Sequence, residues 1–457
     1  MYKRTKDPVH FVGIGGIGMS GIAEILVRQG FPVSGSDLSA SETTRNLESL
    51  GAKVHIGHGA ENLAGAKVLV VSSAIQKNNP ELLEAQRQQI PVVQRAEMLA
   101  EVMRLKFGVA VAGTHGKTTT TSMLASILAH AELDPTIIVG GKINALGSNA
   151  KLGQGQFIVA EADESDGSFL HLSPVVTVIT NIDNDHLDYY GKMEKLRAAF
   201  VEFANKIPYY GRSILCIDDA ELAKTLPLVM KPHWTYGFSE HADFRITDFK
   251  PTERGCSFAV QKQGDLVGTI HLQVPGRHNA LNAVGALAAA LELDVAPTQA
   301  IKGIEAFAGV RRRFEFKGEL LPQGVRIIDD YGHHPTEIKA TLAAAKSQCK
   351  GRLIVAFQPH RFTRTQICWG QFTDAFQQAD KVYLSDIYAA GEPPIEEVTS
   401  EALAETIPNC RYSGDLDQTC ELLQKDLCQG DLLLTLGAGS ITQLSSMLLD
   451  AQNADGS

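Results

Sequence analysis

Long apolar segments are absent from this sequence of 457 residues. No run reaches the roughly 18 apolar residues that indicate a transmembrane helix. The basic residues before Val9 lead into an apolar segment that glycine interrupts, whereas a signal peptide has a continuous apolar core. We therefore expect a protein that stays in the cytoplasm and has no membrane partner.

Cysteine is scarce and scattered. The seven cysteines are odd in number, and no two of them form a CxxC pair. This spacing argues against both a disulfide framework and a cysteine-based zinc site. We expect reduced cytosolic thiols.

Positive charge is in deficit. The 42 Lys and Arg residues are outnumbered by 52 Asp and Glu residues, which gives a formal net charge of −10. Such a chain is a poor nonspecific ligand for polyanions, because any basic face implies a heavier acidic excess elsewhere. We expect no nucleic-acid partner, and any phosphate must be bound by local groups. The sequence leaves monomer and homodimer open.

Short apolar strands alternate with helical patterns in three successive cycles, which is typical of α/β domains built on parallel sheets. The length also favours about three domains. We place them at residues 1–107, 108–312 and 313–457. The predicted strands are Val9–Ile14, Pro32–Ser36 and Val68–Ser72 in the first cycle, Gly108–Gly113, Phe157–Ala160 and Val175–Thr180 in the second, and Val325–Ile328, Arg352–Phe357, Lys381–Leu384 and Asp431–Leu436 in the third.

A glycine-rich loop, Gly13–Gly18, follows the first strand and opens a helix, and Asp37 ends the next strand. This pattern matches the dinucleotide-binding fingerprint, in which glycines let the backbone approach a pyrophosphate. By itself it favours a nicotinamide or flavin enzyme. The loop specifies a pyrophosphate rather than one nucleotide, however, so a UDP-sugar fits equally well. A tight turn without a ligand is the third interpretation.

A second phosphate loop, Ala112–Thr119, lies between a strand and a helix. It offers backbone N–H donors, a lysine for the β- and γ-phosphates and a hydroxyl for Mg²⁺. It departs from the common P-loop because Val111 occupies the position of the outer glycine. An ordinary P-loop motor or GTPase remains an alternative, although the sequence has no guanine-reading NKxD motif.

Two polar clusters follow later strands of the same cycle, where the ligands of an open parallel sheet collect. They are Glu161–Asp166 and Asn181–Asp188. Either cluster alone is typical of a solvated acidic loop. Beside a P-loop lysine, they indicate a Mg²⁺ site, because a cation compensates otherwise repulsive carboxylates.

Motifs along nearly the whole chain resemble those of the Mur ligases and occur in that family's order. They are His10–Gly21, Gly113–Thr119, Glu161–Asp166, Asn181–Asp188, Gly276–Asn279, Asp329–Glu337 and Phe357–Thr365. The resemblance implies an α/β protein with an N-terminal Rossmann-like UDP-binding domain, a central P-loop-type ATPase domain and a C-terminal Rossmann-like domain.

Among Mur ligases, the motifs look like those of the branch that adds L-alanine in peptidoglycan synthesis. The implied reaction joins L-alanine to the lactyl carboxylate of UDP-N-acetylmuramate through an acyl phosphate. It consumes ATP with Mg²⁺, or Mn²⁺ in its place, and releases UDP-N-acetylmuramoyl-L-alanine, ADP and phosphate.

The same resemblance implies roles for individual residues. The ATP set is Gly113, Thr114, His115, Gly116, Lys117, Thr118, Thr119, Asn279, Arg313 and Asp330, and the metal set is Thr118, Glu161 and His186. The UDP-sugar set is Gly15, Gly16, Ile17, Gly18, Asp37, His58, Ser72, Ser73 and Ala74, and the alanine set is Tyr331, His333, Arg361 and Arg364. The residues expected to act in catalysis are Lys117, His186, His333, Arg361 and Arg364.

Simpler structural interpretations compete with some of these roles. Arg311–Arg313 is also consistent with a solvated linker, His334 with a helix cap, and Asn282 with the buried face of a helix. His115 and His360 are at most positioning residues.

Three other functions compete with alanine addition. A recycling ligase that attaches an intact tripeptide to the same UDP-sugar would share the ATP site, but as the family is understood it lacks the arginine pair Arg361 and Arg364. An NAD-dependent oxidoreductase would use the first loop and leave the second unexplained. A noncatalytic nucleotide switch would hydrolyse ATP without coupling.

One departure from the wider family concerns its metal site. Ligases that add later residues carry a carbamoylated lysine where this chain has Phe200. The alanine-adding branch is understood to lack that group, so Phe200 fits this branch and leaves the number of Mg²⁺ ions open.

Overall fold

The computed structural model describes residues 6–72, 74–104, 106–139, 150–252, 254–321 and 323–455. Ser73, one of the predicted UDP-sugar residues, lies outside these ranges, and the side chain of Ile17 is not described either. The chain forms two compact units. The first comprises Met1–Thr247, Ala259–Ile270 and Leu281–Phe307, and the second comprises Asp248–Phe258, His271–Ala280 and Ala308–Ser457.

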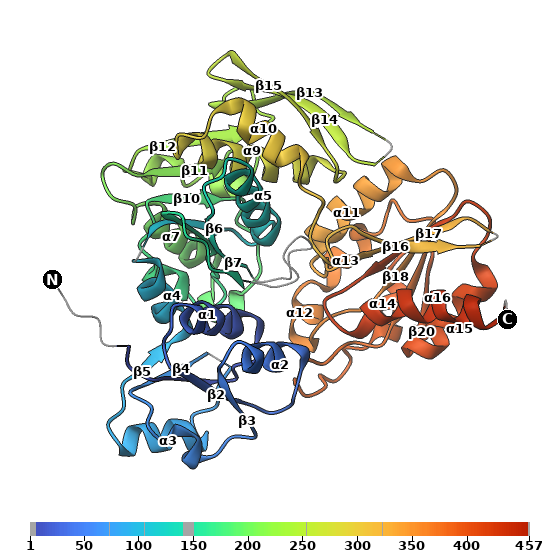
Figure 1. The fold of residues 1–457 in the computed structure, drawn as a ribbon. Coiled ribbons are helices and arrows are strands. Elements are labelled where there is room, and N and C mark those ends of the chain that lie inside the picture. Colours follow the sequence, from blue (N-terminus) through green and yellow to red (C-terminus); the bar gives the residue numbers. More distant parts are fainter. Residues whose placement is uncertain are drawn as a thin grey trace. The chain divides into compact units, whose positions relative to one another are not determined.

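A five-stranded parallel sheet forms the N-terminal part of the first unit, in the order β3-β2-β1-β4-β5 (Figure 1). Its strands are β1 (Val9–Val12), β2 (Val33–Asp37), β3 (Lys53–Ile56), β4 (Val68–Val71) and β5 (Val92–Gln94), and its helices are α1 (Ile17–Arg28), α2 (Glu42–Ser49), α3 (Pro80–Arg87) and α4 (Arg95–Met103). The strand order reverses between β1 and β4. Ligands of doubly wound sheets bind at such a reversal, and the first glycine loop follows β1 there.

A ten-stranded sheet follows, in the order β15-β14-β13-β12-β11-β10-β6-β9-β7-β8. Its strands are β6 (Phe107–Ala112), β7 (Thr136–Ile138), β8 (Ala150–Lys151), β9 (Phe157–Glu161), β10 (Val176–Ile179), β11 (Arg212–Cys216), β12 (His233–Gly237), β13 (Phe244–Pro251), β14 (Cys256–Lys262) and β15 (Asp265–Leu272). Strand β6 pairs in parallel with both β10 and β9, so the segments after these three strands leave the same edge. This edge carries the second phosphate loop and both polar clusters.

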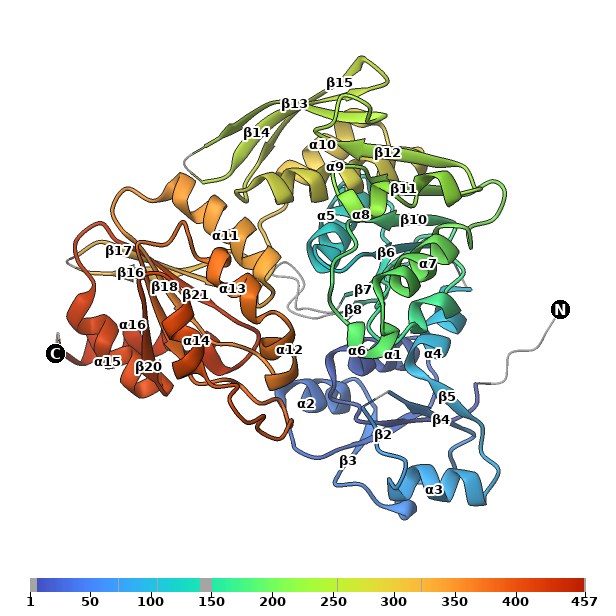
Figure 2. The ribbon, with the colours of Figure 1, turned by 180° about the vertical axis from the view of Figure 1, so that it is seen from behind.

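The associated helices are α5 (Lys117–His130), α6 (Leu187–Tyr190), α7 (Met193–Ala204), α8 (Ala220–Ala223), α9 (Arg277–Glu292) and α10 (Pro297–Glu305). Helices α5 and α7 lie on opposite sides of the central strands (Figures 1 and 2). Helix α10 packs closely on α5, because a Cβ atom at Gly303 would lie 2.5 Å from Cα of Ile127. This packing fixes the helix that begins at the second phosphate loop.

The second unit contains a six-stranded sheet in the order β16-β17-β21-β18-β19-β20. Its strands are β16 (Glu315–Leu320), β17 (Val325–Asp330), β18 (Leu353–Phe357), β19 (Lys381–Ser385), β20 (Cys410–Gly414) and β21 (Leu432–Leu436), and its helices are α11 (Pro335–Gln348), α12 (Phe362–Ile367), α13 (Trp369–Ala375), α14 (Ser400–Thr406), α15 (Leu416–Asp426) and α16 (Leu444–Asp455). Leu353, Val355 and Phe357 belong to one core cluster, whereas Ile354 and Ala356 belong to another. The sheet is therefore buried on both faces, as alternating side chains on a parallel strand require.

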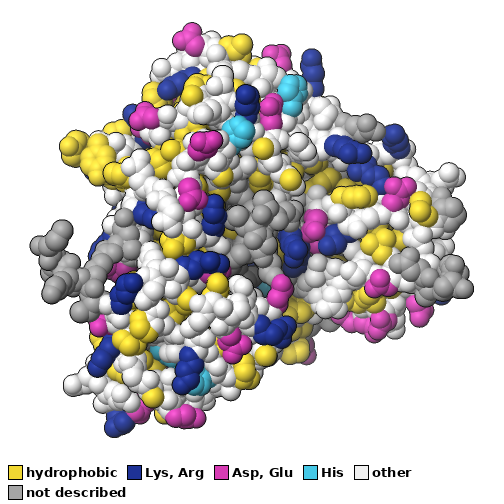
Figure 3. Space-filling model, viewed as in Figure 1, with side chains coloured by type: hydrophobic (Ala, Val, Ile, Leu, Met, Phe, Trp, Pro, Cys, Tyr) yellow, Lys and Arg dark blue, Asp and Glu magenta, His cyan; other side chains and the backbone are white. Residues whose placement is uncertain are grey.

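All ten predicted strands are present, with ends within two residues of the predicted ones. The sequence did not predict the other strands of the described structure, among them β13–β15, nor the antiparallel pairing of β16 with β17. None of the helices in the described part of the chain is long and apolar enough to cross a membrane. On the face drawn in Figure 3, the described acidic and basic side chains are interspersed. The boundaries at residues 107 and 312 stay predictions.

Phe200 lies on α7 and is completely buried. Its ring packs edge-on against Phe169, with 5.4 Å between centroids, and Phe169 also contacts Phe203. An apolar ring therefore fills this position of α7.

Replacing Phe200 with Ala should lower the free energy of unfolding by about 3–5 kcal/mol, because a fully buried ring is lost and a cavity is left. Urea unfolding followed by fluorescence measures the change. The exposed Tyr209 provides the matched control, since Tyr209→Ala should change stability by no more than about 0.5 kcal/mol. Equal effects of the two substitutions would contradict the packing described for Phe200.

Candidate active site

The second phosphate loop turns sharply between β6 and α5. Gly113 has φ of 130° and Gly116 has φ of 84°, backbone conformations that favour glycine. A Cβ atom at Gly113 would lie 2.0 Å from Oγ1 of Thr180, and one at Gly116 would lie 2.6 Å from Oδ1 of Asn282. No side chain caps the start of α5, so the helix presents its backbone N–H groups to an anion.

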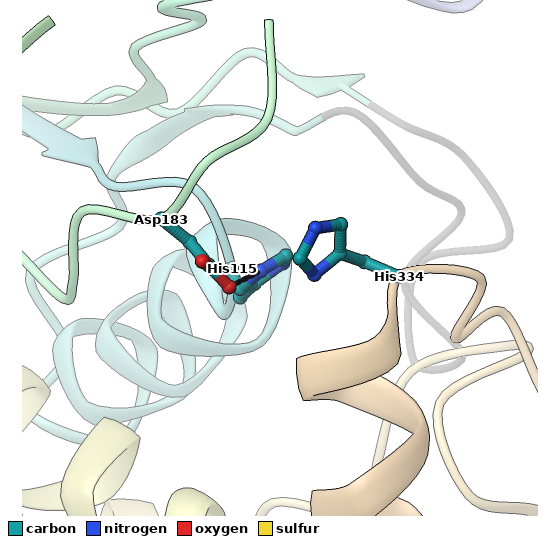
Figure 4. A group of neighbouring side chains, drawn as sticks. All are labelled: His115, Asp183 and His334. Atoms are coloured by element: carbon teal, nitrogen blue, oxygen red, sulfur yellow. Dashed lines mark hydrogen bonds and ion pairs between the residues drawn. The ribbon is translucent and has the colours of Figure 1, made fainter. Parts of the chain in front are cut away.

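The segment after β10 holds this loop in shape. Asn181 accepts a hydrogen bond from the backbone N–H of His115 at 2.8 Å through Oδ1 and donates to the His115 carbonyl at 2.9 Å through Nδ2. The hydroxyl of Thr180 donates to the same carbonyl. Asp183 donates its backbone N–H to Oγ1 of Thr114 and contacts Nε2 of His115 at 2.9 Å (Figure 4). These contacts fix the backbone and the ring of His115 within the loop.

Lys117 lies folded back over the loop and is paired with a buried carboxylate. Its Nζ donates to the carbonyls of Gly113 and Thr114 and lies 2.9 and 2.8 Å from the two carboxylate oxygens of Glu164. The hydroxyl of Tyr190 fixes the backbone of Glu164 by donating to its carbonyl at 2.6 Å. Burial lowers the pKa of Lys117, but the charge and hydrogen bond of Glu164 and the charges of Asp163 and Glu161 together outweigh burial, so the pKa is raised overall. Lys117 is therefore charged before any nucleotide binds.

The three predicted metal ligands lie at one edge of the sheet. Thr118 stands in the first turn of α5, Glu161 ends β9, and His186 follows β10. Nε2 of His186 lies 3.8 Å from Oε1 of Glu164 and 3.7 Å from Oδ2 of Asp185, so carboxylates surround the imidazole. A hydroxyl, carboxylates and an imidazole at a phosphate loop fit Mg²⁺, which takes oxygen ligands and retains phosphate oxygens and waters.

The first glycine loop is held by Asp37, which the sequence assigned to the UDP-sugar set. Oδ2 of Asp37 accepts the backbone N–H of Gly15 at 2.9 Å. Gly13 has φ of 76°, and Gly16 precedes α1 without a side-chain cap. The carboxylate therefore serves the loop itself, and the N-terminal backbone of α1 is left to bind a pyrophosphate.

The other predicted UDP-sugar residues lie at the same edge of this sheet. His58 follows β3 and is partly buried, Ser72 follows β4 and is partly buried, and the adjacent Ala74 is exposed. Since the strands are parallel, these positions and the first loop gather at their carboxyl ends.

Arg95 connects the first glycine loop to the acidic cluster Glu161–Asp166 within the first unit. It begins α4, and its side chain packs against Gly18, where a Cβ atom would lie 3.1 Å from the guanidinium group. Its Nη2 pairs with Oδ2 of Asp163 at 3.1 Å. Sequence analysis missed Arg95 because it stands outside every motif.

In the second unit, the predicted alanine residues Tyr331 and His333 belong to a series of ring contacts that continues to His360 and Tyr388. The ring centroids of Tyr331 and His333 are 5.4 Å apart, those of His333 and His360 are 5.7 Å apart, and His360 stacks on Tyr388 at 5.5 Å. Nη1 of Arg364 contacts Nδ1 of His360 at 3.2 Å. Burial and the Arg364 charge lower the pKa of His360 to about 4, so His360 is a neutral ring in this group.

The two arginines of the predicted pair have different partners. Arg364 contacts His360, whereas Nε of Arg361 pairs with Oε1 of Glu392 at 2.9 Å. Arg361 also has a φ of 71°, which is unusual for a residue other than glycine. The geometry therefore brings Arg364, Tyr331 and His333 into one group and places Arg361 in a separate ion pair beside it.

Asp330 lies inside the second unit and binds the backbone around it. Its carboxylate accepts the N–H groups of Gly332 at 2.8 Å and Phe314 at 2.7 Å, and the hydroxyl of Thr341 at 3.3 Å. Burial raises the pKa of Asp330 to about 6, against the opposing charge of Arg313. Both carboxylate oxygens have partners within the protein. The predicted contact of Asp330 with ATP stays a prediction.

Arg312 and Arg313 do not form a solvated linker. Both guanidinium carbons lie 5.0 Å from the ring centroid of Tyr331, on which cations bind favourably. Arg313 also contacts Oε1 of Glu337 at 3.5 Å. Arg311 alone is exposed.

Three further residues have local partners. His334 is the N-cap of α11, and its Nδ1 accepts the N–H of Thr336 at 3.4 Å, which confirms the predicted cap. Asn279 donates to the Pro275 carbonyl at 2.7 Å. Asn282 faces Gly116, so it supports the phosphate loop as well as the buried face of α9.

Known proteins resemble this chain along its whole length. Models of the Mur ligase family match in three parts: the description "Mur ligase family, catalytic domain" covers residues 8–107, "Mur ligase middle domain" covers 111–290, and "Mur ligase, glutamate ligase domain" covers 312–439. A UDP-N-acetylmuramate–L-alanine ligase from Geobacter sp. (strain M21) is 54% identical over 449 residues, which are 97% of each chain.

Solved structures show the same three-domain α/β fold. A UDP-N-acetylmuramate-alanine ligase from Thermotoga maritima has a TM-score of 0.83 and 28% identity, covering 98% of this chain and 99% of its own. A murein peptide ligase from Psychrobacter arcticus has a TM-score of 0.71 and 25% identity, covering 98% of both chains. Family models across most of its length and a relative that matches it almost end to end show that the chain belongs to the Mur ligase family.

Proposed function

We propose that this ligase joins L-alanine to the lactyl carboxylate of UDP-N-acetylmuramate at the expense of ATP, in peptidoglycan synthesis. The observation that carries the proposal is the pair of phosphate loops in one compact unit, in which the ion pair between Arg95 and Asp163 connects the first loop to the acidic cluster beside the second. One loop suits the pyrophosphate of a UDP-sugar, and the other suits a triphosphate. The relative that is 54% identical carries the name of this activity.

The chemistry explains why such a ligase needs a triphosphate. A carboxylate is a poor acceptor for an amine, because its departing oxygen is too basic. In the first step the lactyl carboxylate oxygen forms a bond to the γ-phosphorus, and the bond from that phosphorus to ADP breaks. The amine of alanine then attacks the acyl carbon, phosphate leaves, and the nitrogen loses a proton.

The second phosphate loop supplies the groups for the first step. Residues 113–119 present backbone N–H groups to the phosphates, and Lys117 brings a positive charge to the transferring group. Thr118, Glu161 and His186 would hold Mg²⁺, which would add further positive charge at the phosphate oxygens. The family resemblance adds Asn279, Arg313 and Asp330 on the adenine and ribose side.

The ring contacts of Tyr331, His333 and His360 in the second unit suit the second step, the attack of the alanine amine on the acyl carbon. Nδ1 of His333 lies 3.1 Å from the carbonyl oxygen of Tyr331, which can only accept a hydrogen bond. The hydrogen of a neutral His333 ring is therefore on Nδ1, and Nε2 keeps a lone pair that can take the proton of the amine. Arg361 and Arg364 are proposed to hold the alanine carboxylate, for which a guanidinium is well shaped.

The geometry argues against the oxidoreductase alternative. The carboxylate of Asp37 accepts a backbone N–H of the first glycine loop. An oxidoreductase would also have no use for the ion pair between Lys117 and Glu164. The recycling ligase is the remaining alternative, since it would share the ATP site.

Phosphate release with UDP-N-acetylmuramate and a panel of amino acids tests the proposal. We expect release with L-alanine and none with the tripeptide L-alanyl-γ-D-glutamyl-meso-diaminopimelate. Release with the tripeptide alone would establish the recycling activity instead. Phosphate release from ATP that depends on neither the UDP-sugar nor alanine would contradict the ligase proposal and favour a noncatalytic nucleotide switch.

Replacing Lys117 with Ala should reduce kcat at least about a hundredfold, because the transferring phosphoryl group loses its nearest positive charge. The Kd of UDP-N-acetylmuramate, measured by calorimetry, should stay nearly unchanged, since that ligand uses the first loop. Lys195→Ala on the exposed face of α7 is the control. A comparable loss of UDP-sugar affinity in Lys117→Ala would contradict the assignment of two separate phosphate sites.

Replacing Glu164 with Gln should lower the Kd of ATP in the absence of Mg²⁺ by about tenfold, since Lys117 no longer has to leave a charged partner to reach the phosphates. Fluorescence titration with a nucleotide analogue measures this change. Asp163→Asn is the control, because it removes a nearby charge that does not contact Lys117. If both variants lowered the Kd of ATP equally, the effect would come from the loss of any nearby negative charge and not from the contact between Glu164 and Lys117.

A further inference from the structure

A buried carboxylate lies near the carboxyl ends of the strands of the first sheet, where the predicted UDP-sugar residues gather. The proposed mechanism does not use this carboxylate. Glu81 stands in the first turn of α3 and is completely buried. Its Oε1 accepts Nδ2 of Asn62 at 2.6 Å and the backbone N–H of Gly59 at 3.3 Å. Its Oε2 accepts the hydroxyl of Ser36 at 2.6 Å.

Glu81 is ionised at neutral pH. Burial raises the pKa of its carboxyl, but the nearby His10 ring and the hydrogen bonds from Ser36 and Asn62 together outweigh burial and lower the pKa to about 2. A carboxylate in this state can only accept hydrogen bonds.

The hydrogen atoms of this cluster can therefore be counted. The Ser36 hydroxyl has a single hydrogen, and it points to Glu81. Nδ1 of His58 lies 2.9 Å from the same hydroxyl oxygen, so it must be the donor of that second hydrogen bond. A neutral His58 ring is thus protonated on Nδ1 and carries a lone pair on Nε2.

The other groups near Glu81 leave this arrangement intact. Nε2 of His10 and Nδ1 of His58 lie 3.8 and 3.6 Å from Oε2, which is beyond hydrogen-bond distance. His10 is fully buried, and its Nδ1 is 2.8 Å from Oγ of Ser34. Ser36 is therefore the hydroxyl that connects the buried carboxylate to His58.

The connection leads to the proposed ligand edge. The His58 side chain is 16% exposed, and it follows β3 at the carboxyl end of the strands. Ser36 directly precedes Asp37, which holds the first glycine loop through Gly15. Successive side chains of a strand point to opposite faces of the sheet. Asp37 therefore contacts the first glycine loop, and Ser36, on the other face of β2, contacts His58.

We propose that Glu81, acting through Ser36, fixes the tautomer of His58 so that Nε2 accepts a hydrogen bond from an N–H or O–H group of the UDP-sugar. Glu81 is then a positioning residue for substrate recognition. The inference rests on the proposed function, because His58 belongs to the UDP-sugar set.

The variant Glu81→Gln should reverse this chain of hydrogen bonds. Asn62 and the Gly59 N–H are fixed donors, so the amide oxygen of glutamine takes the place of Oε1 and its NH₂ group faces Ser36. Ser36 then accepts from the amide and donates to Nδ1 of His58. The ring hydrogen moves to Nε2, which becomes a donor.

Ring ¹⁵N chemical shifts of histidine-labelled protein distinguish the two tautomers, and the spectrum of His58→Asn assigns the signal. We expect Nδ1 to be the protonated nitrogen in the unaltered protein and Nε2 in Glu81→Gln. An Nε2-protonated neutral ring in the unaltered protein would overturn the proposal without any need for a stable variant.

Calorimetry then tests recognition. We expect the Kd of UDP-N-acetylmuramate to rise about tenfold in Glu81→Gln, while the Kd of ATP is unchanged. Glu84→Gln on the same helix is the matched control, because Glu84 pairs with Arg87 at the surface. Equal UDP-sugar affinity in the unaltered protein and Glu81→Gln would sink the inference, whereas no binding by the unaltered protein would sink the proposed function.

Discussion

The buried ion pair between Lys117 and Glu164 is the interaction on which the triphosphate site depends. An ammonium group removed from water without a partner is strongly unfavourable, so the loop could not hold its lysine ready without a carboxylate. Glu164 follows β9 and is fixed through Tyr190, which follows β10, while Lys117 follows β6. The pair therefore ties together the ends of three adjacent strands. A triphosphate that takes over Lys117 replaces one anion with another and leaves Glu164 beside the metal ligands.

The same solution recurs at the first sheet on a smaller scale. There, Asp37 accepts a backbone N–H of the glycine loop, and the buried Glu81 accepts a hydrogen bond from the hydroxyl of Ser36. Both loops that suit polyphosphates are thus supported by carboxylates rather than by basic patches. This arrangement explains how a chain with net charge −10 can bind two highly charged anions. Fixed N–H groups and single cations provide the attraction, and the surrounding acids set their geometry.

The sequence predicted ten of the strands and both phosphate loops because each rests on local information: contiguous apolar runs and glycines at fixed spacing. It did not predict β14 and β15, although their two-residue connection, Gln263 and Gly264, both with positive φ, is typical of a hairpin. Within Glu161–Asp166, the sequence could not single out Glu164 for Lys117, since adjacent acids look alike until backbone direction is known. Arg95 and Asn181 could not be assigned either, because their partners lie 68 and 66 positions away.

His58 and His333, two of the predicted site residues, illustrate what a hydrogen-bond network adds to residue identity. In a neutral ring, each gives Nδ1–H to an oxygen of the protein, the Ser36 hydroxyl or the Tyr331 carbonyl, so the lone pair of each ring is on Nε2. A carboxylate lies at a similar distance from each Nδ1: Glu337 is 3.5 Å from His333, and Glu81 is 3.6 Å from His58. The difference is the Ser36 hydroxyl, which lies between His58 and Glu81 and donates its hydrogen to the carboxylate. In the proposed mechanism, the same tautomer therefore serves recognition at the first sheet and proton transfer in the second unit.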